Sequence, residues 1–133
     1  MLPNFVHAGV PKSGSKTLQL MLKHHPDVYV PDAKEQNFFS NDTFYKRGTE
    51  WYEKTFYQDS GTAKAVGDLS IGYASGLSLD VPERIIECLG KDTRILFTFR
   101  NPVERAYSTY CMAHYKARLD KLPFNESIGR ALA

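Results

Sequence analysis

Apolar residues in this chain gather in short blocks separated by polar turns, and the blocks follow two different periods. Continuous apolar runs predict buried β-strands over residues 5–10, 28–30, 63–66 and 94–99. Between these runs, apolar residues recur every three to four positions, which predicts helices over residues 16–24, 49–57, 82–89 and 102–118. Strands that alternate with helices predict an α/β fold built around a parallel sheet.

Residues at the expected helix ends support this reading. Asn101 is a typical helix cap, Pro102 suits the first helical position, and Glu104 completes a capping-box spacing. Thr49 is the expected cap of the second helix. In the first helix the leucines and Met21 cluster as in a helix that buries its apolar side.

Composition narrows the class of protein. The 133 residues are 42% hydrophobic and 24% charged, which suits one globular core, and the net charge of +2 is too small to indicate nucleic-acid binding. No stretch reaches the roughly eighteen apolar residues of a membrane span, and no secretory signal is visible. Cys88 and Cys111 are isolated, so we expect reduced thiols, no metal site and a cytoplasmic protein.

The segment "HAGVPKSGSKTLQLML" (residues 7–22) places a glycine-containing loop between a strand and a helix start. Backbone N–H groups and the positive end of a helix dipole meet at such a point, and they attract phosphate or sulfate. Further charge and hydroxyl donors come from Lys12, Ser15, Lys16 and Thr17.

The same loop departs from the nucleotide-triphosphatase rule GxxxxGK[ST]. Gly9 and Gly14 have the required separation, but Ser15 stands at the lysine position and Lys16 follows one residue late. That lysine would point about 100° away around the helix, which weighs against an ATP or GTP site. A solvated turn before a core helix is the alternative reading of this loop.

Two segments carry a resemblance to a known family. "PKSGSKTL" resembles the 5′-phosphosulfate-binding loop of sulfotransferases that use 3′-phosphoadenosine 5′-phosphosulfate (PAPS), in particular the heparan-sulfate and bacterial type. "FTFRNPVERAYSTY" (97–110) resembles the 3′-phosphate segment of the same family, R-[DN]-P-x-x-R-A-x-S-x-Y. The resemblance implies a P-loop-like three-layer sandwich with a central parallel sheet. The residues it implies for binding the donor are Lys12, Ser13, Gly14, Ser15, Lys16, Thr17, Arg100 and Ser108.

A third segment, "PDAKEQNFFS" (31–40), resembles the catalytic loop of this family. The resemblance implies that Glu35 is the general base that takes the proton of an acceptor hydroxyl. It also implies that Lys12 stabilises the charge on the departing nucleotide, 3′,5′-adenosine bisphosphate, without a metal ion. We expect Phe38 and Phe39 to anchor this loop in the core.

A fourth segment, "KAVGDLSIGYA" (64–74), matches the family only in part. Asp68 and Leu69 replace a glutamate and a lysine of the family pattern, whereas Ser70 and Tyr73 match it. In glycan-modifying relatives that lysine helps to position the acceptor, so its absence weighs against a heparan-type substrate. The acceptor hydroxyl could therefore belong to a glycan, a lipid or a small metabolite.

The resemblance covers residues 5–131 but only the N-terminal and central portion of a family domain. We therefore expect residues 1–133 to form a single sulfotransferase domain that lacks its C-terminal part. An incomplete sheet exposes apolar surface, which predicts self-association. Two other functions stay open at this point, a P-loop kinase or NTPase and a non-catalytic nucleotide-binding module.

Overall fold

The computed structural model describes residues 1–33, 35–75, 80–117 and 122–132. Its contacts divide the chain into two compact units, Met1–Phe99 and Arg100–Ala133. The first unit contains the sheet and the predicted Gly14 and Glu35 loops, and the second is helical.

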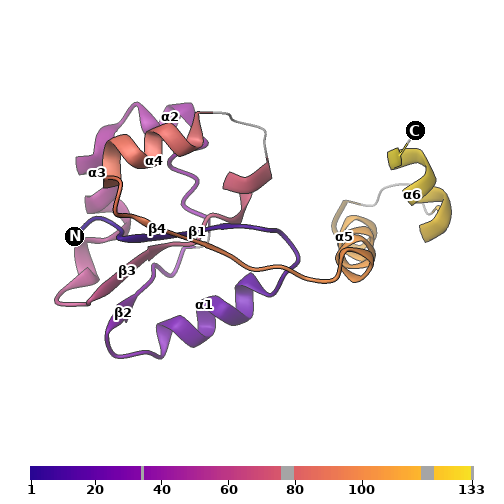
Figure 1. The fold of residues 1–133 in the computed structure, drawn as a ribbon, viewed down its shortest axis with the longest axis horizontal. Coiled ribbons are helices and arrows are strands. Elements are labelled where there is room, and N and C mark those ends of the chain that lie inside the picture. Colours follow the sequence, from indigo (N-terminus) through magenta and orange to yellow (C-terminus); the bar gives the residue numbers. More distant parts are fainter. Residues whose placement is uncertain (34, 76–79, 118–121, 133) are drawn as a thin grey trace. The chain divides into compact units, whose positions relative to one another are not determined.

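In the described part of the first unit, four strands form a parallel sheet with the order β2-β3-β1-β4 (Figure 1). The strands are β1 (Phe5–Gly9), β2 (Val28–Tyr29), β3 (Ala65–Asp68) and β4 (Arg94–Phe97). Phe5 of β1 lies opposite Gly67 of β3 on one side and Arg94 of β4 on the other. Because the strands are parallel, their carboxyl ends share one edge of the sheet.

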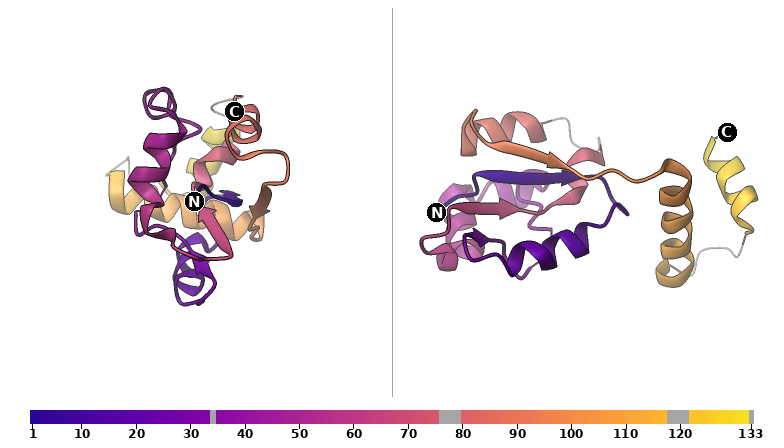
Figure 2. Two further views of the ribbon diagram at one scale, coloured as in Figure 1. Left: turned by 90° about the vertical axis from the view of Figure 1, so that its left-hand side faces the viewer. Right: turned by 60° about the horizontal axis from the view of Figure 1, so that its bottom comes forward.

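Helices cover both faces of this sheet (Figures 1 and 2). One face carries α1 (Ser15–Lys23), and the opposite face carries α2 (Asp42–Tyr45), α3 (Gly48–Phe56) and α4 (Val81–Leu89). Two short 3₁₀ turns, η1 (Gln58–Ser60) and η2 (Ile71–Ser75), connect these elements. This is the three-layer α/β architecture expected from the alternation of strands and helices.

An aromatic core fills the layer between the sheet and α3. Phe38 and Phe39 are completely buried, which confirms their expected role as anchors. The ring of Phe38 stacks on that of Tyr52 with 4.1 Å between centroids. Val6, Tyr52, Tyr57 and Val66 are also completely buried.

The first helix was predicted to bury its leucines and Met21, and this prediction was wrong for two of these residues. Leu20 and Met21 are 50% and 68% exposed, whereas Gln19 is buried. The Gln19 amide donates a hydrogen bond of 3.1 Å to the Pro31 carbonyl, so a polar tie connects α1 to the segment after β2. Because β2 has only two residues, it offers α1 a narrow apolar face, which leaves the outer leucine and methionine in solvent.

The second helical region also differs from the prediction. Thr49 is not a cap, because α3 begins one residue earlier and Arg47 precedes it without a side-chain cap. The sequence reading missed α2. Its cap is Asn41, whose side-chain oxygen accepts hydrogen bonds from the Thr43 and Phe44 amides at 2.9 and 3.2 Å.

The second unit consists of α5 (Pro102–Ala117) and α6 (Phe124–Leu132). Asn101 caps α5 as predicted, since its side chain accepts from the amides of Val103 and Glu104 at 3.0 and 3.4 Å. The Tyr107 and Phe124 rings pack edge to face between the two helices, with centroids 5.2 Å apart.

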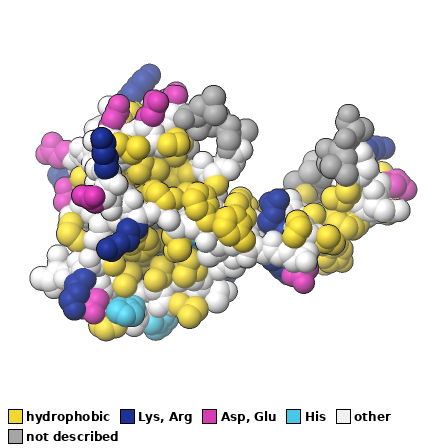
Figure 3. Space-filling model, viewed as in Figure 1, with side chains coloured by type: hydrophobic (Ala, Val, Ile, Leu, Met, Phe, Trp, Pro, Cys, Tyr) yellow, Lys and Arg dark blue, Asp and Glu magenta, His cyan; other side chains and the backbone are white. Residues whose placement is uncertain are grey.

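The edge strand β4 exposes apolar side chains to solvent, those of Ile95, Leu96 and Phe97. A hollow of about 500 Å³ lies between α4 and the β1–β4 pair, lined among others by Ile85, Ile95 and Phe97. On the face of the first unit seen in Figure 3, hydrophobic side chains gather in broad patches. Among the described helices, none has the length and apolarity needed to cross a membrane.

Candidate functional site

The connections that follow β1 and β3 leave the sheet on opposite faces, and ligands bind at such a point in many α/β proteins. The chain leaves β1 toward α1 on one face, and it leaves β3 toward η2 and α4 on the opposite face. Because β1 and β3 are neighbours, their connections separate and open a crevice at the carboxyl ends of the strands. The predicted donor loop follows β1 at this edge.

This Gly14 loop (residues 10–14) has the backbone shape of an anion cradle. Lys12 and Gly14 both have left-handed backbones, with φ values of 68° and 87°. Such turns direct successive N–H groups to one side, where they can bind an anion. A Cβ built on Gly14 meets nothing within 4 Å, so the space beside the loop is open to a ligand.

The charged and hydrogen-bonding groups of the loop are also suited to bind an anion. The Ser13 hydroxyl oxygen is buried and lacks a hydrogen-bond partner among the described residues. α1 begins without a side-chain cap and without an acidic residue in its first turn, which leaves its positive end uncompensated. No ion pair among the described side chains involves Lys12 or Lys16. These residues therefore fit the phosphosulfate end of a donor such as PAPS.

Glu35 lies close to the start of α1. It is exposed, and it lines a small hollow of about 20 Å³ together with Ser15, Gln19, Leu69 and Ile71. The structure thus brings the predicted base together with Ser15, one of the residues expected to bind the donor. The ion pairs of the described residues include none with Glu35.

Arg100 and Ser108 belong to the second unit. The Arg100 guanidinium donates to the Glu104 carboxylate at 3.0 Å, and both side chains are exposed. Ser108 is half-buried on α5. No hydrogen bond joins Arg100 to Ser108 within the described residues of this unit. Because Glu104 occupies the guanidinium, the expected capping-box contact from Glu104 back to Asn101 is replaced by this ion pair.

A buried polar cluster stands at the end of β3. The Asp68 carboxylate accepts hydrogen bonds from the hydroxyls of Ser70, Tyr52 and Tyr73, at 2.5, 2.5 and 2.8 Å. Asp68 is completely buried, and this burial raises the pKa of its carboxyl above the ordinary value. The sequence showed Asp68 only as a replacement for a glutamate. The sequence signal at this cluster is that Ser70 and Tyr73 match the family pattern, and it did not show that both contact Asp68.

A second buried group lies on β1. His7 is fully buried, and its Nε2 lies 3.0 Å from the Thr98 hydroxyl oxygen. Burial lowers the pKa of His7, which favours the neutral ring. Thr98, the residue directly after β4, also exchanges main-chain hydrogen bonds with Gly9 and Val10, so His7 helps to hold the start of the Gly14 loop beside the end of β4.

Residues 2–128 match the family model described as a sulfotransferase domain. The chain belongs to the sulfotransferase family. It is 36% identical over 109 residues to heparan sulfate glucosamine 3-O-sulfotransferase 5 of Mus musculus, covering 82% of this chain and 30% of that protein. It is 31% identical over 124 residues to the membrane-associated sulfotransferase kil1 of Dictyostelium discoideum, covering 92% of this chain and 25% of that protein.

A solved structure agrees with this sulfotransferase assignment. The crystal structure of a sulfotransferase from Alicyclobacillus acidocaldarius superposes with a TM-score of 0.74 and 31% sequence identity. The match covers 98% of this chain and 57% of that chain. The P-loop-like α/β fold expected from the sequence is therefore confirmed. The chain spans between a quarter and a third of the length of these two curated sulfotransferases.

Proposed function

We propose that the protein transfers a sulfuryl group from PAPS to a hydroxyl of an acceptor and releases 3′,5′-adenosine bisphosphate. The observation that carries this proposal is that Glu35 shares a hollow with Ser15, at the start of α1. A candidate base and a candidate anion cradle therefore lie side by side. In this proposal residues 1–133 are part of one sulfotransferase domain.

The two ends of the donor would be held by different segments. Lys12, the Ser13 hydroxyl and the amides at the start of α1 would bind the 5′-phosphosulfate, with Gly14, Ser15, Lys16 and Thr17 completing the cradle. The Ser13 hydroxyl supports this, because it is buried without a hydrogen-bond partner among the described residues, at a cost of about 1–3 kcal/mol that a ligand would recover. Arg100 and Ser108 would bind the 3′-phosphate by charge-assisted hydrogen bonds.

Transfer would proceed by a single displacement at sulfur. The acceptor oxygen attacks the sulfuryl sulfur as its proton passes to the Glu35 carboxylate. The bond between sulfur and the bridging oxygen breaks, and its electron pair stays on the departing 5′-phosphate, where Lys12 offsets the developing charge. The cationic side chains of Lys12, Lys16 and Arg100 would offset much of the negative charge of the donor, and the scheme calls on no metal ion.

Two alternatives are weaker. A P-loop kinase or NTPase needs a lysine directly after the second glycine, and Ser15 stands there. A non-catalytic nucleotide-binding module would have no use for a carboxylate such as that of Glu35 beside the cradle. Self-association through the apolar hollow at β4 is part of the proposal, as is a cytoplasmic location, which the two free cysteines favour.

Binding and transfer measurements test the proposal. Calorimetry should detect 3′,5′-adenosine bisphosphate and should not detect ATP with Mg²⁺ at the same concentration. Labelled PAPS should then transfer its sulfuryl group to members of a panel of glycan, lipid and small-molecule hydroxyls. Preference for ATP would favour the kinase alternative, and binding without transfer to any acceptor would favour the non-catalytic module.

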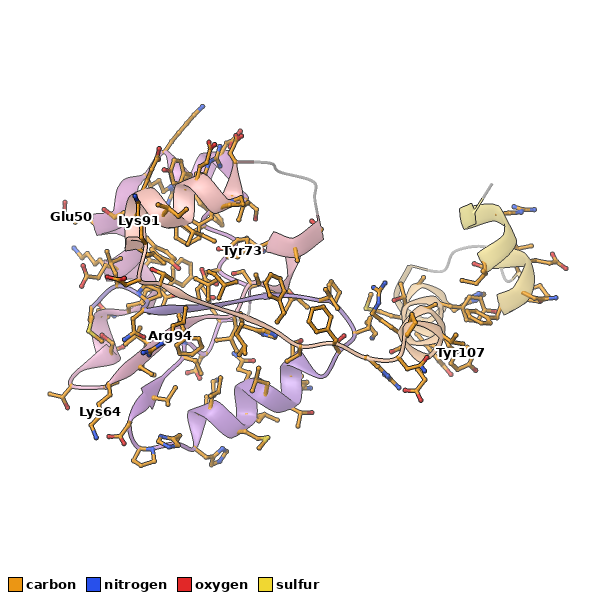
Figure 4. All side chains as sticks on the ribbon, viewed as in Figure 1. Glu50, Lys64, Tyr73, Lys91, Arg94 and Tyr107 are labelled. Atoms are coloured by element: carbon orange, nitrogen blue, oxygen red, sulfur yellow. The ribbon has the colours of Figure 1, made fainter. Side chains whose placement is uncertain are left out.

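Substitution of the base sharpens this test. Glu35→Gln should leave bisphosphate affinity unchanged and slow transfer about 10²-fold or more, because the amide cannot take the proton. Glu50→Gln is the matched control, since Glu50 is exposed in the first turn of α3 (labelled in Figure 4). An unchanged rate in Glu35→Gln would remove Glu35 from the mechanism.

A further inference from the structure

The loop that carries Glu35 is attached to the end of β3 by three hydrogen bonds. The amides of Asn37 and Phe39 donate to the Ser70 and Tyr73 hydroxyl oxygens, at 3.0 and 3.3 Å. In the opposite direction, the Leu69 amide donates to the side-chain oxygen of Gln36 at 3.2 Å. These bonds join segments more than 30 residues apart, and their partners in the loop are the residues that follow Glu35.

Asp68 makes the Ser70 and Tyr73 hydroxyls acceptors in their bonds with the loop amides. A hydroxyl has one proton to donate, and both Ser70 and Tyr73 donate theirs to the Asp68 carboxylate. Their lone pairs are therefore left to accept the two loop amides. Tyr73 lies on η2, on the face of the sheet where the aromatic core packs (Figure 4). Because Asp68 is completely buried, water does not compete for these hydroxyls.

The loop needs such a support because its backbone is strained on both sides of Gln36. Glu35 and Asn37 have left-handed φ values of 55° and 52°, and neither residue is a glycine. A non-glycine residue in this region costs of the order of 1–2 kcal/mol and persists only where its surroundings hold it. Gln36 between them is buried, and its side-chain amide donates to the Ala33 carbonyl at 2.6 Å.

We propose that Asp68, acting through the Ser70 and Tyr73 hydroxyls, is a positioning residue that fixes Glu35 in its orientation toward the donor cradle. The inference rests on the proposed role of Glu35 as the base. Asp68 touches neither donor nor acceptor in this scheme. Its effect reaches the reaction only through the direction of two hydroxyls and the two amides that they hold.

Two variants remove one link each and leave the core packing in place. Ser70→Ala deletes the hydroxyl that holds the Asn37 amide, and Tyr73→Phe deletes the one that holds the Phe39 amide. Tyr57→Phe is the matched control, because Tyr57 belongs to the same buried cluster but its hydroxyl contacts that of Tyr52, at 3.1 Å. No recorded hydrogen bond joins the Tyr57 hydroxyl to a described amide of the Glu35 loop.

Rate, affinity and amide exchange are measured on all three variants. Ser70→Ala and Tyr73→Phe should each slow transfer about 10- to 100-fold, the effect of a small displacement of a reacting group. Bisphosphate affinity should stay within about twofold of the unmodified protein. The Asn37 and Phe39 amides should exchange with deuterium at least about tenfold faster in the respective variants. Tyr57→Phe should change neither rate nor exchange.

A double substitution separates positioning from general destabilisation. In the Glu35→Gln background, Ser70→Ala should slow transfer no further, because its effect passes through the missing carboxylate. If Ser70→Ala slowed transfer further in the Glu35→Gln background, the positioning role would be overturned. The same holds if Tyr57→Phe slowed transfer as much as Ser70→Ala does. Unchanged amide exchange in both variants would overturn the attachment itself. Absence of transfer in the unmodified protein would instead refute the proposed function, and the positioning role would fall with it, whatever the exchange data show.

Discussion

Arg100 shares its guanidinium with Glu104, four residues along the chain at the start of α5. An exposed pair of this kind contributes roughly 0–1 kcal/mol, whereas a charge-assisted hydrogen bond to phosphate contributes about 1.5–3 kcal/mol. The proposed 3′-phosphate would therefore displace Glu104 from the guanidinium.

Substitution of this arginine should weaken donor binding. We expect Arg100→Ala to reduce the affinity for 3′,5′-adenosine bisphosphate by about 1.5–3 kcal/mol in calorimetry. Glu104→Gln is the control, and it should bind the bisphosphate as tightly as the unmodified protein or more tightly, because it removes the competing carboxylate. Equal affinity in Arg100→Ala and the unmodified protein would show that the 3′-phosphate binds elsewhere.

At the scale of elements, the pairing of β1 with β3 leaves no room for a side chain at Gly67. Phe5 lies opposite Gly67 in the strand register, and its ring covers the glycine. A Cβ built on Gly67 would lie only 2.2 Å from the end of that ring. The glycine thus leaves room for the tip of the Phe5 ring beside the neighbouring strand.

An added methyl group should therefore destabilise the sheet. We expect Gly67→Ala to lower the free energy of unfolding by about 1–3 kcal/mol, the usual cost of overpacking, as measured by urea denaturation. Gly72→Ala is the matched control, because the nearest atom to its added Cβ would be 3.8 Å away, an ordinary contact. A loss of stability equal to that of the control would mean that Phe5 moves aside without cost.

The elements also show what a sequence can and cannot predict. The strands, the Pro82 helix start and the Asn101 cap were predictable because apolar runs and capping residues act locally. The exposed side of α1 was not, since it depends on the width of the sheet beneath the helix. Asn41 is a good cap, but it stands in a polar stretch that offered no apolar period from which to infer α2.

The same division applies to the candidate site. The sequence predicted the Gly14 loop and Glu35 from family motifs, and the structure brings Ser15 and Glu35 to one hollow. It did not predict the links from Ser70 and Tyr73 to the loop, because these join main-chain amides to side chains far along the chain. Contacts of this kind leave no spacing rule in the sequence.

At the scale of the molecule, the buried Asp68 carboxyl makes stability depend on pH. Burial raises its folded-state pKa above the ordinary value of 3.8, although the hydroxyls of Ser70, Tyr52 and Tyr73 act in the opposite direction. The folded state therefore holds this proton more tightly than the unfolded state does. The contribution of Asp68 to stability is greatest below about pH 4 and falls as the pH rises through the folded-state pKa.

Asp68→Asn should remove this dependence. We expect the free energy of unfolding of the variant to fall less steeply than that of the unmodified protein between about pH 4 and pH 7, as measured by urea denaturation at each pH. Asp59→Asn, which changes an exposed carboxylate, should keep the original slope. Parallel slopes in Asp68→Asn and the unmodified protein would show that Asp68 titrates alike in both states.

The attachment of the Glu35 loop leaves one of its side chains open to redesign. The bonds to β3 hold the amides of Asn37 and Phe39, so the side chain at position 37 can be exchanged without loosening them. The Ser40 hydroxyl, in contrast, donates to the Asn37 carbonyl at 3.4 Å and belongs to the loop's own hydrogen bonding. A library at position 37 would vary a side chain two residues from the base and leave the base in place. Position 37 has a left-handed backbone, so glycine, aspartate and histidine are suitable replacements there and β-branched residues are not.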